Sequence, residues 1–425
     1  MDYRLSALQQ IKKPHAIELF AGVGGFRLGI REWWDVVWSN QWEPSTKAQH
    51  ASDCYVRHFG DDGHVCESIE EVLRKIRDEE MEMIPDHDLL TAGFPCQDYS
   101  VARTLNQATG LSGKKGVLWW SIREVLRLKR PRYILLENVD RLLKSSASQR
   151  GRDFAVMLSS LADLGYRAEW RVINAADYGF PQRRRRVFIV GERIQETLDD
   201  PDGWIQQDGI LARAFPVRFG TPPLGQDRFD LDESLEVLSD EFGVGRKVSQ
   251  FQNAGMMQDF HVSTMKVQPD FDEDEGKATL EDILQVHEVD ESFFITDSSE
   301  WSRLKDAKKE PRVHKGSNTP YVYAEGAIAF PDRLDIPSRT ILTGEGGSSP
   351  SRFKHVIRTP DGRLRRLTPF ELERLNGFSG DWTEEFSDNK RAFLMGNALV
   401  VGVVARIAEV LKSEFQHKSV SQSIP

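Results

Sequence analysis

Short apolar runs alternate with stretches of helical periodicity through the first half of the chain. Apolar runs of about five residues bounded by turn residues predict strands, and apolar positions repeating every three or four residues predict helices. Between residues 69 and 77, Ile69, Val72, Leu73 and Ile76 fall on one helical face. The predicted strands are 16–20, 35–39, 88–92, 133–137, 167–174 and 187–191, and the predicted helices are 26–33, 69–77, 117–128 and 153–164. This alternation predicts an α/β fold with a mostly parallel sheet and helices on both faces.

Regular periodicity is lost after Gly191. Residues 200–230 are rich in Asp, Pro and Gly, and residues 314–351 contain only short β-like pieces between turn residues. Helical periodicity returns at 369–375 and, more strongly, at 400–411. Because 425 residues exceed the usual size of one domain, we expect a second domain that is irregular or β-rich.

The charge of the chain is unevenly distributed. The net charge is −10, but residues 226–300 alone hold 20 acidic and 5 basic residues, so the rest of the chain is net positive. Basic clusters at 183–186 and 352–366 could meet phosphates, although a solvated face is the plainer interpretation of any single basic residue. The distribution therefore permits a nucleic-acid partner that the total charge would not suggest.

Cysteine usage and hydropathy indicate the compartment. Cys54, Cys66 and Cys96 show neither paired nor zinc-type spacing, which favours a reducing intracellular environment and no metal. No apolar run reaches the roughly 18 residues of a membrane span, and the N-terminus lacks a signal pattern. We expect a cytoplasmic, nucleoid-associated protein with no membrane contact.

Three chemically distinct groups fall at the ends of predicted strands. Cys96 follows one strand in the turn Gly93-Phe94-Pro95-Cys96-Gln97, Glu137 ends the next, and Arg186 precedes the last. Open α/β sheets bind their ligands at strand ends. A thiol nucleophile, a proton donor and a fixed cation are suited to covalent attack on a pyrimidine ring. A buried inert cysteine and an ordinary strand-end carboxylate are the alternatives for Cys96 and Glu137 taken alone.

These residues lie in motifs that resemble, in order and spacing, those of the DNA (cytosine-5)-methyltransferases. The motifs are Phe20-Ala21-Gly22-Val23-Gly24-Gly25, Pro95-Cys96-Gln97, Glu137-Asn138-Val139, Gln182 with Arg184 and Arg186, Arg365-Arg366-Leu367-Thr368-Pro369 through Phe378, and Gly396-Asn397. The resemblance covers about residues 15–192 and 338–412. It implies a Rossmann-like methyltransferase domain at 1–192 and an inserted target-recognition domain at 193–350. A return segment at 351–425 would end in a helix that packs on the first domain.

The resemblance implies S-adenosyl-L-methionine as the cofactor and S-adenosyl-L-homocysteine as its product. The implied cofactor residues are Phe20, on which adenine would stack, Gly22, Gly24, Gly25, Gln41, Trp42, Ser68, Ile69, Pro95 and Asn397. Gln41 stands where the family usually has an acidic residue for the ribose, with Glu43 as the alternative. Ser68 stands at the usual adenine-binding aspartate, with Glu67 as the alternative. A structural turn and a helix N-cap are the plainer interpretations of the glycines and of Asn397.

The resemblance also assigns catalytic and DNA-binding residues. Cys96 would add to C6 of a flipped-out cytosine, Glu137 would meet N3 and N4, Arg186 would meet O2, and Arg184 would support the cysteine region. The implied DNA-binding residues are Gln97, Ser100, Thr340 and Arg365.

The sequence therefore predicts a DNA cytosine-5 methyltransferase that acts on double-stranded DNA. We expect a monomer on DNA, in a restriction-modification system with a cognate endonuclease or as an orphan enzyme. An RNA (tRNA) cytosine-5 methyltransferase on the same scaffold and a catalytically inactive DNA-binding regulator are the rival hypotheses.

Overall fold

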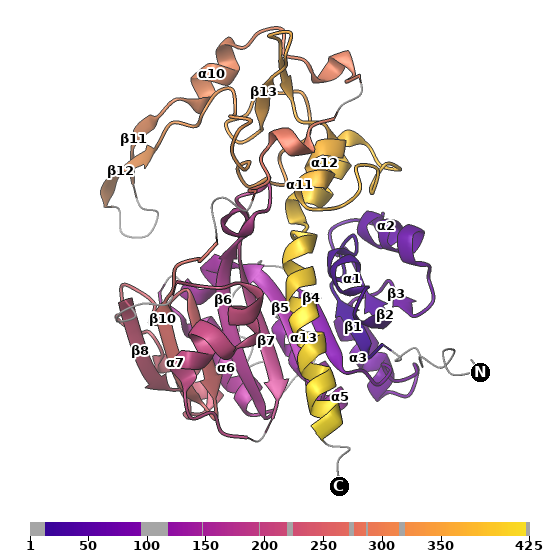
Figure 1. Cartoon of the computed structure of the whole chain (residues 1–425), viewed down its shortest axis with the longest axis vertical. Helices are drawn as coiled ribbons and strands as arrows, with labels where there is room; N and C mark the ends of the chain where they lie inside the picture. The colour runs from indigo at the N-terminus through magenta and orange to yellow at the C-terminus, as the bar shows by residue number, and fades with distance from the viewer. Residues whose placement is uncertain are drawn as a thin grey trace, which may run out of the picture. The chain divides into compact units, whose positions relative to one another are not determined.

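The computed structural model divides the chain into two compact units (Figure 1). It describes residues 13–94, 118–146, 148–194, 196–218, 224–271, 276–285, 288–313 and 319–421. The first unit comprises Met1–Val172, Arg186–Asp270 and Val403–Pro425, and the second comprises Ile173–Arg185 and Phe271–Gly402. The chain thus leaves the first unit twice and returns twice.

A mixed sheet forms the core of the first unit. Within the described residues its strands are β1 (His15–Leu19), β2 (Asp35–Asn40), β3 (His64–Val65), β4 (Leu89–Gly93), β5 (Tyr133–Val139), β6 (Tyr166–Asn174), β7 (Arg185–Arg193), β8 (Leu224–Asp230), β9 (Ala254–Gln258) and β10 (His261–Lys266). They lie in the order β3-β2-β1-β4-β5-β7-β6-β9-β10-β8. The strands from β3 to β5 pair in parallel, whereas β7 pairs antiparallel with β5. The predicted α/β fold is confirmed, and every strand predicted in the first half is present.

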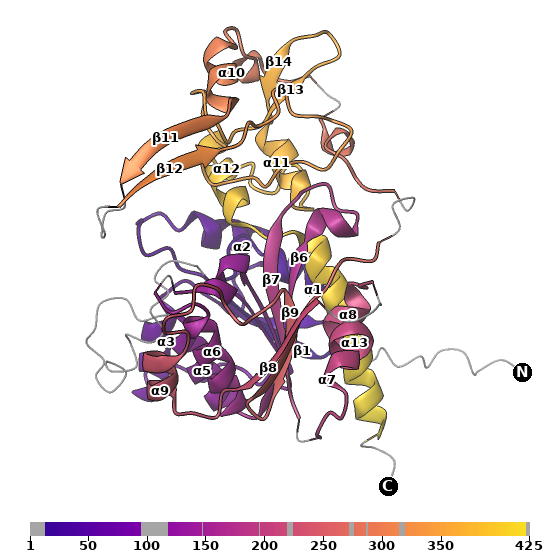
Figure 2. The same cartoon turned by 90° about the vertical axis from the view of Figure 1, so that its left-hand side faces the viewer.

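Helices cover both faces of this sheet. The longer ones are α1 (Gly25–Ile30), α2 (His50–Phe59), α3 (Ile69–Arg77), α5 (Leu118–Lys129), α6 (Arg152–Ala162), α9 (Leu235–Glu241) and α13 (Val401–Ser421). The short ones are α7 (Pro201–Gly203), α8 (Ile210–Ala214), a π-helical turn at Trp204–Asp208 and 3₁₀ turns at Asp140–Lys144 and Ala175–Tyr178. Figure 2 shows α3, α5, α6 and α9 on one face and α7, α8 and α13 on the other. The sequence analysis missed α2 and underestimated the length of α13.

Residues 193–270 extend the first sheet, although we expected a separate domain to begin at residue 193. Strands β9 and β10 are buried on both faces, with Met257 and Val262 in the main core and Met256 and Met265 packed near Ile205. A strand buried on both faces has no apolar–polar alternation to reveal it. Gly255 weakens the pattern further, but it is required, because a Cβ there would lie 2.2 Å from the Trp170 ring. Residues 193–270 therefore belong to the first unit, and the chain enters the second unit at Phe271 instead of at residue 193. Residues 351–402 also belong to the second unit.

The second unit is irregular, as predicted for this part of the chain. Its described strands are β11 (Lys308–Val313) with β12 (Pro320–Glu325), and β13 (Val356–Arg358) with β14 (Leu364–Arg366). Its helices are α10 (Ser299–Lys305), α11 (Pro369–Leu375) and α12 (Asp388–Asn397), with 3₁₀ turns at Glu281–Ile283 and Glu291–Phe293. A capping box begins α11: Thr368 accepts from the Glu371 backbone N–H, and Glu371 accepts from the Thr368 backbone N–H.

One helical stretch, Asp388–His417, is long and apolar enough to cross a membrane by length and composition. Most of its apolar window, 61%, is buried within the protein. The side chains of Val404, Ile407, Ala408 and Leu411 on α13 are fully buried. The pattern is that of a core helix, and it is weak evidence for a membrane span.

Two charged side chains on β6 hold the ends of helix α8. Glu169 accepts from the backbone N–H groups of Ile210 (2.8 Å) and Leu211 (3.3 Å) at the start of the helix. Arg171, two residues along the strand, donates to the carbonyls of Leu211 (3.1 Å) and Phe215 (2.7 Å) and also to that of Ile205. Both side chains are buried, so these contacts replace the water that helix ends otherwise need.

Replacing Arg171 with methionine should lower the free energy of unfolding by about 3 kcal/mol, because several buried carbonyls lose a charged donor. Urea unfolding followed by circular dichroism measures the change. Arg303→Met is the matched control: the Arg303 side chain is 71% exposed, and its loss should cost less than about 0.5 kcal/mol. Equal stability of the two variants would contradict this account of α8.

Candidate functional site

Glu137 and Arg186 form an ion pair at the end of the parallel half of the sheet. Glu137 lies on β5 and Arg186 on β7, and the antiparallel register pairs Arg186 with Val139. Arg186 Nε lies 2.9 Å from Glu137 Oε1, and the two side chains are only 18% and 13% exposed. The geometry presents a fixed carboxylate and a fixed guanidinium side by side, so a hydrogen-bond acceptor lies next to a cationic hydrogen-bond donor.

The end of β4 is held against the same carboxylate. Gly93 is the register partner of Glu137, and an added Cβ at Gly93 would lie 3.7 Å from Glu137 Oε2. Asn138 donates to the Phe94 carbonyl at 3.0 Å and accepts from the Val139 backbone N–H at 2.8 Å. The end of β4, at Gly93 and Phe94, is therefore held next to Glu137 and Asn138. The expected residues Pro95, Cys96, Gln97 and Ser100 lie outside the described residues.

A tight turn follows β1 at the same edge of the sheet. Phe20 has a φ of 54°, and Gly22 has a φ of 56°, a left-handed conformation that favours glycine. The backbone N–H of Gly22 donates to Gln41 Oε1 at 2.7 Å, so Gln41 ties this turn to the end of β2. Gln41 is buried, whereas Trp42 beside it is exposed. Gly24 and Gly25 lead directly into α1.

The expected cofactor residues Ser68 and Ile69, and the alternative Glu67, all make contacts within the protein. Ser68 caps α3 by accepting from the Glu71 backbone N–H at 3.3 Å, and Ile69 packs in the core. Glu67 is paired with Lys75 at 2.6 Å. Among the residues expected at this edge, none is basic. A neutral, aromatic-lined donor set fits an uncharged adenosine with a cationic sulfonium better than it fits a phosphate. Within the described residues no cluster of three or more His, Cys, Asp or Glu could hold a metal ion.

A buried polar cluster that the sequence analysis missed lies behind the glycine turn. Glu18 on β1 is fully buried and accepts from the Tyr55 hydroxyl at 3.2 Å. Arg27 on α1 donates to the same hydroxyl at 3.1 Å. Burial raises the pKa of Glu18 to about 8, against the opposing effects of Tyr55 and Arg27. The sequence signal that could have indicated this cluster is a single Glu inside the otherwise apolar predicted strand 16–20.

In the second unit, the segment 182–184 anchors the segment that carries Thr340. Gln182 accepts from the Ile341 backbone N–H at 3.1 Å and donates to Asn376 Oδ1 at 2.9 Å. Arg184, which is buried, donates to the carbonyls of Ile341 (3.1 Å) and Gly396 (2.8 Å). Thr340 donates its hydroxyl hydrogen to the Arg183 carbonyl. These anchoring contacts of Arg184 were not expected from the sequence.

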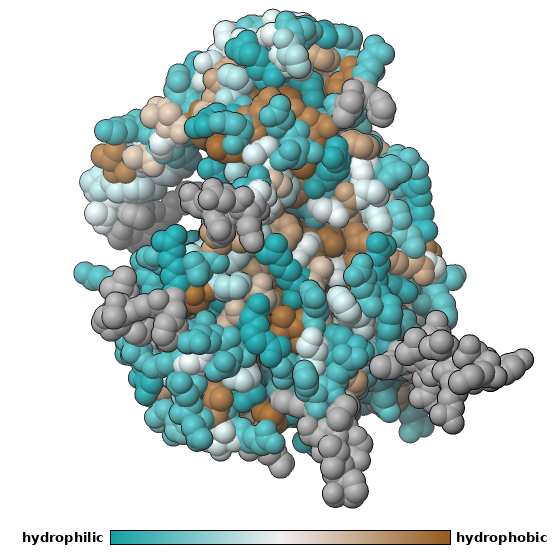
Figure 3. Space-filling model, in the orientation of Figure 1, coloured by the Kyte–Doolittle hydropathy of each residue, from teal (hydrophilic) through white to brown (hydrophobic). Residues whose placement is uncertain are grey.

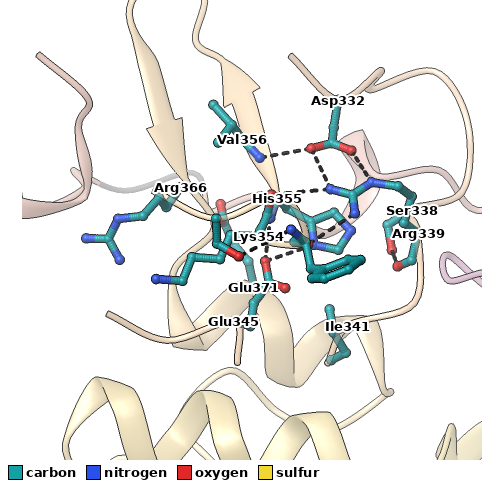
Figure 4. Close-up of polar contacts among 12 residues, drawn as sticks. Asp332, Ser338, Arg339, Ile341, Glu345, Lys354, His355, Val356, Arg366 and Glu371 are labelled. Atoms are coloured by element: carbon teal, nitrogen blue, oxygen red, sulfur yellow. Dashed lines mark hydrogen bonds and ion pairs between the residues drawn. The ribbon is translucent and has the colours of Figure 1, made fainter. Parts of the chain in front are cut away.

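Charged side chains brace the same segment from its other side (Figure 4). Asp332 accepts two hydrogen bonds from Arg339, at 2.7 and 3.1 Å, and a third from the Val356 backbone N–H at 2.9 Å. Glu345 accepts from the backbone N–H of His355 and contacts its ring Nδ1 at 2.9 Å. Thr340 thus lies between Arg339, which is linked through Asp332 to the first residue of β13, and Glu345, which contacts the residue just before β13.

Arg365 and Asn397 both lie in the second unit. Arg365 is buried and donates to both carboxylate oxygens of Glu371, at 2.8 and 2.6 Å. Its guanidinium therefore stabilises the unit internally, and the DNA contact expected of Arg365 stays a prediction. Asn397 is exposed and is the last residue of α12, so it is not a helix N-cap.

Comparisons with known proteins agree with this geometry. A family model described as C-5 cytosine-specific DNA methylase matches residues 15–413. The chain is 44% identical over 414 residues to type II methyltransferase M.Sau3AI of Staphylococcus aureus, covering 95% of this chain and 96% of that protein. It is 33% identical over 401 residues to type II methyltransferase M.NlaX of Neisseria lactamica, covering 93% and 96%.

Solved structures show the same fold at low sequence identity. The S. pombe Dnmt2 methyltransferase superposes with a TM-score of 0.57 at 16% identity, covering 95% of this chain and 99% of that one. The Entamoeba histolytica methyltransferase EhMeth gives a TM-score of 0.54 at 15% identity, covering 95% and 99%. The predicted Rossmann-like methyltransferase fold is confirmed.

Replacing Glu18 with glutamine should change how stability depends on pH. The folded-state pKa of Glu18, about 8, exceeds the ordinary value of 4.5, so folding favours the protonated carboxyl. The stability that neutral Glu18 contributes is complete below about pH 4.5 and is lost as the pH rises towards 8. Glu18→Gln does not titrate, so wild-type stability relative to the variant should fall over this range.

Urea unfolding of both proteins between pH 4.5 and 8.5 measures that difference. The control is Glu32→Gln, since Glu32 is exposed and its substitution should leave the pH dependence of the wild type intact. A constant difference between wild type and Glu18→Gln across the range would refute the assignment of a protonated Glu18.

Proposed function

The chain belongs to the C-5 cytosine-specific DNA methylase family, and we propose that it methylates C5 of a flipped-out cytosine in duplex DNA through a covalent adduct on Cys96. The observation that carries the proposal is the Glu137–Arg186 pair at the point where β4 leads towards Cys96. C5 and C6 of a stacked cytosine are inaccessible, so the base must leave the duplex before reaction.

Each of the three groups has a separate task on the extruded ring. The Cys96 thiolate forms a bond to C6, and the displaced electron pair moves towards N3. Glu137 donates a proton or hydrogen bond at N3 and accepts from the N4 amino group, while Arg186 donates to O2. A base then removes the C5 proton after methylation, and the C6–sulfur bond breaks to restore the aromatic ring and the thiolate.

The cofactor, S-adenosyl-L-methionine, would supply an electrophilic methyl group on a sulfonium. Phe20 and the turn from Gly22 to Gly25 would bind it, with Gln41 and Trp42 at the end of β2. The hydrogen bond from Gly22 to Gln41 keeps that turn in one conformation before any ligand arrives. Asn397, Ser68, Ile69 and Pro95 remain predicted contacts.

Sequence recognition is assigned to the predicted recognition segment, and within it to the second unit. Residues 193–270 are part of the sheet of the first unit, which leaves residues 271–350 of that segment for reading DNA. Thr340 is retained as a DNA-facing residue. The braces from Asp332 to Arg339 and from Glu345 to His355 support this role, because a base-reading segment must hold its shape. Arg184 would act as a positioning residue for that segment.

A role in restriction-modification is supported by the names of the relatives. Both M.Sau3AI and M.NlaX are type II methyltransferases. We infer that this chain protects DNA against a cognate endonuclease inside a bacterial cell and acts on DNA as a monomer.

Cys96→Ser should abolish methyl transfer to duplex DNA while leaving DNA and cofactor affinity within about twofold of wild type, because a serine hydroxyl is a poor nucleophile near neutral pH. Incorporation of tritiated methyl groups and gel-shift titration measure the two properties. Cys66→Ser is the matched control, since Cys66 is an exposed cysteine directly after β3 and is not among the residues assigned to catalysis. Turnover by Cys96→Ser near the wild-type rate would exclude the covalent mechanism.

Glu137→Gln should lower the single-turnover rate about 10²–10⁴-fold, since glutamine keeps the shape of the side chain but cannot deliver a proton to N3. Cofactor affinity should not change, which isothermal titration can verify. Glu124→Gln serves as the control because Glu124 is paired with Arg127 on the surface of α5. If Glu137→Gln lost cofactor binding while retaining its chemical rate, Glu137 would belong to the cofactor site.

A further inference from the structure

The β11–β12 hairpin of the second unit has two chemically different faces. The strands form a separate two-stranded antiparallel sheet, in which directly opposed residues share a face. One face carries Lys308, Glu310, Arg312, Tyr321, Tyr323 and Glu325. The other face, here called the valine face, carries Lys309, Pro311, Val313, Pro320, Val322 and Ala324.

Three of the four charged residues of the first face, Glu310, Arg312 and Glu325, are paired within the second unit. Arg312 pairs with Glu310 at 2.9 Å, and its guanidinium lies 3.6 Å from the centre of the Tyr323 ring. Glu325 pairs at 3.0 Å with the buried Arg352, which also fixes the base of the hairpin. This face is therefore engaged with its own strands and with the unit from which the hairpin projects.

The valine face is uncovered in the described structure. All six of its residues are exposed, with Val322 at 67% and Val313 at 55%. Figure 3 shows hydrophobic side chains on the projecting hairpin, where Figure 1 places β11 and β12. A two-stranded ribbon gains little stability by itself, so an exposed apolar face along it marks a surface that binds something.

We propose that the valine face enters a groove of the DNA duplex and is part of the sequence-reading surface, an inference that rests on the proposed function. A two-stranded ribbon fits the major groove, which is about 12 Å wide. Six residues per strand span about 20 Å, roughly the length over which a straight ribbon can follow a groove. Val and Pro side chains can contact thymine methyl groups and sugars, which a charged face would not favour.

Charge favours DNA over a second copy of this chain as the occupant. The valine face has one basic residue, Lys309, and none of its six residues is acidic. Residues 301–366 around it carry 14 basic and 7 acidic residues, the reverse of the balance at 226–300. Lys309 lies at the end of the ribbon nearest the rest of the unit, where a groove-bound ribbon would meet the phosphate backbone.

The test introduces a negative charge on this face. Val322→Glu should weaken binding to a cognate duplex at least about tenfold at low salt, because like charge against phosphate is repulsive. It should raise KM for DNA with little change in kcat at saturating DNA. The matched control is Val248→Glu, an exposed valine of the first unit at 76% exposure, and it should behave as wild type. Thermal melting and cofactor titration establish that both variants fold.

Lys309→Ala is a second variant that does not disturb the apolar positions. It should lower the slope of log affinity against log salt by about one, as loss of one phosphate contact requires. Analytical ultracentrifugation of all variants reports the oligomeric state without DNA.

The outcomes separate this inference from the proposed function. Wild-type methylation of duplex DNA, with Val322→Glu and Lys309→Ala binding as tightly as Val248→Glu, would overturn the assignment of the ribbon and leave the function intact. A wild-type oligomer that Val322→Glu dissociates would overturn it in favour of a second copy. Absence of methylation of duplex DNA by wild type, with transfer to tRNA, would instead overturn the proposed function.

Discussion

The antiparallel pairing of β5 with β7 is the constraint on which the candidate site depends. Its register places Arg186 beside Glu137, and a shift by one residue would turn the guanidinium to the opposite face of the sheet. The chain reaches β7 through Gln182 and Arg184, which fix Ile341 in the second unit. Alternate residues of one short segment therefore serve two purposes. Gln182 and Arg184 anchor the segment that carries Thr340, and Arg186 forms the ion pair with Glu137.

Buried polar groups set the shape of the site as much as apolar packing does. Asn138 holds the carbonyl of Phe94, and Gln41 holds the backbone of Gly22, so both turns at the strand ends are fixed from a neighbouring strand. Glu18 lies beneath them, fully buried against Tyr55. Such groups cost free energy when they are unpaired, and each of these three side chains makes a hydrogen bond to a specific neighbour. These hydrogen bonds tie the turns after β1 and β4 to the neighbouring strands β2 and β5.

The sequence predicted the parallel half of the fold and placed Glu137 and Arg186 at strand ends, because short apolar runs and ordered motifs are local signals. It did not predict the ion pair between the two side chains. It did not predict β9 and β10, which are buried on both faces and interrupted by Gly255. It also did not predict that Arg365 is buried against Glu371, since this burial depends on a tertiary contact and a basic cluster looks the same in sequence whether exposed or buried. The contact from Arg184 to Ile341 spans 157 residues, a distance at which no local pattern operates.

The most direct test of the account is to identify the residue that bonds to the base. A duplex carrying 5-fluorocytosine at the target position retains the covalent adduct, because the fluorine cannot be removed as the C5 proton would be. Digestion and mass spectrometry of the trapped protein should locate the nucleotide on the peptide that contains Cys96. An adduct on Cys54 or Cys66, or complete methylation of an ordinary duplex with no trapped protein on the fluorinated one, would contradict the central claim.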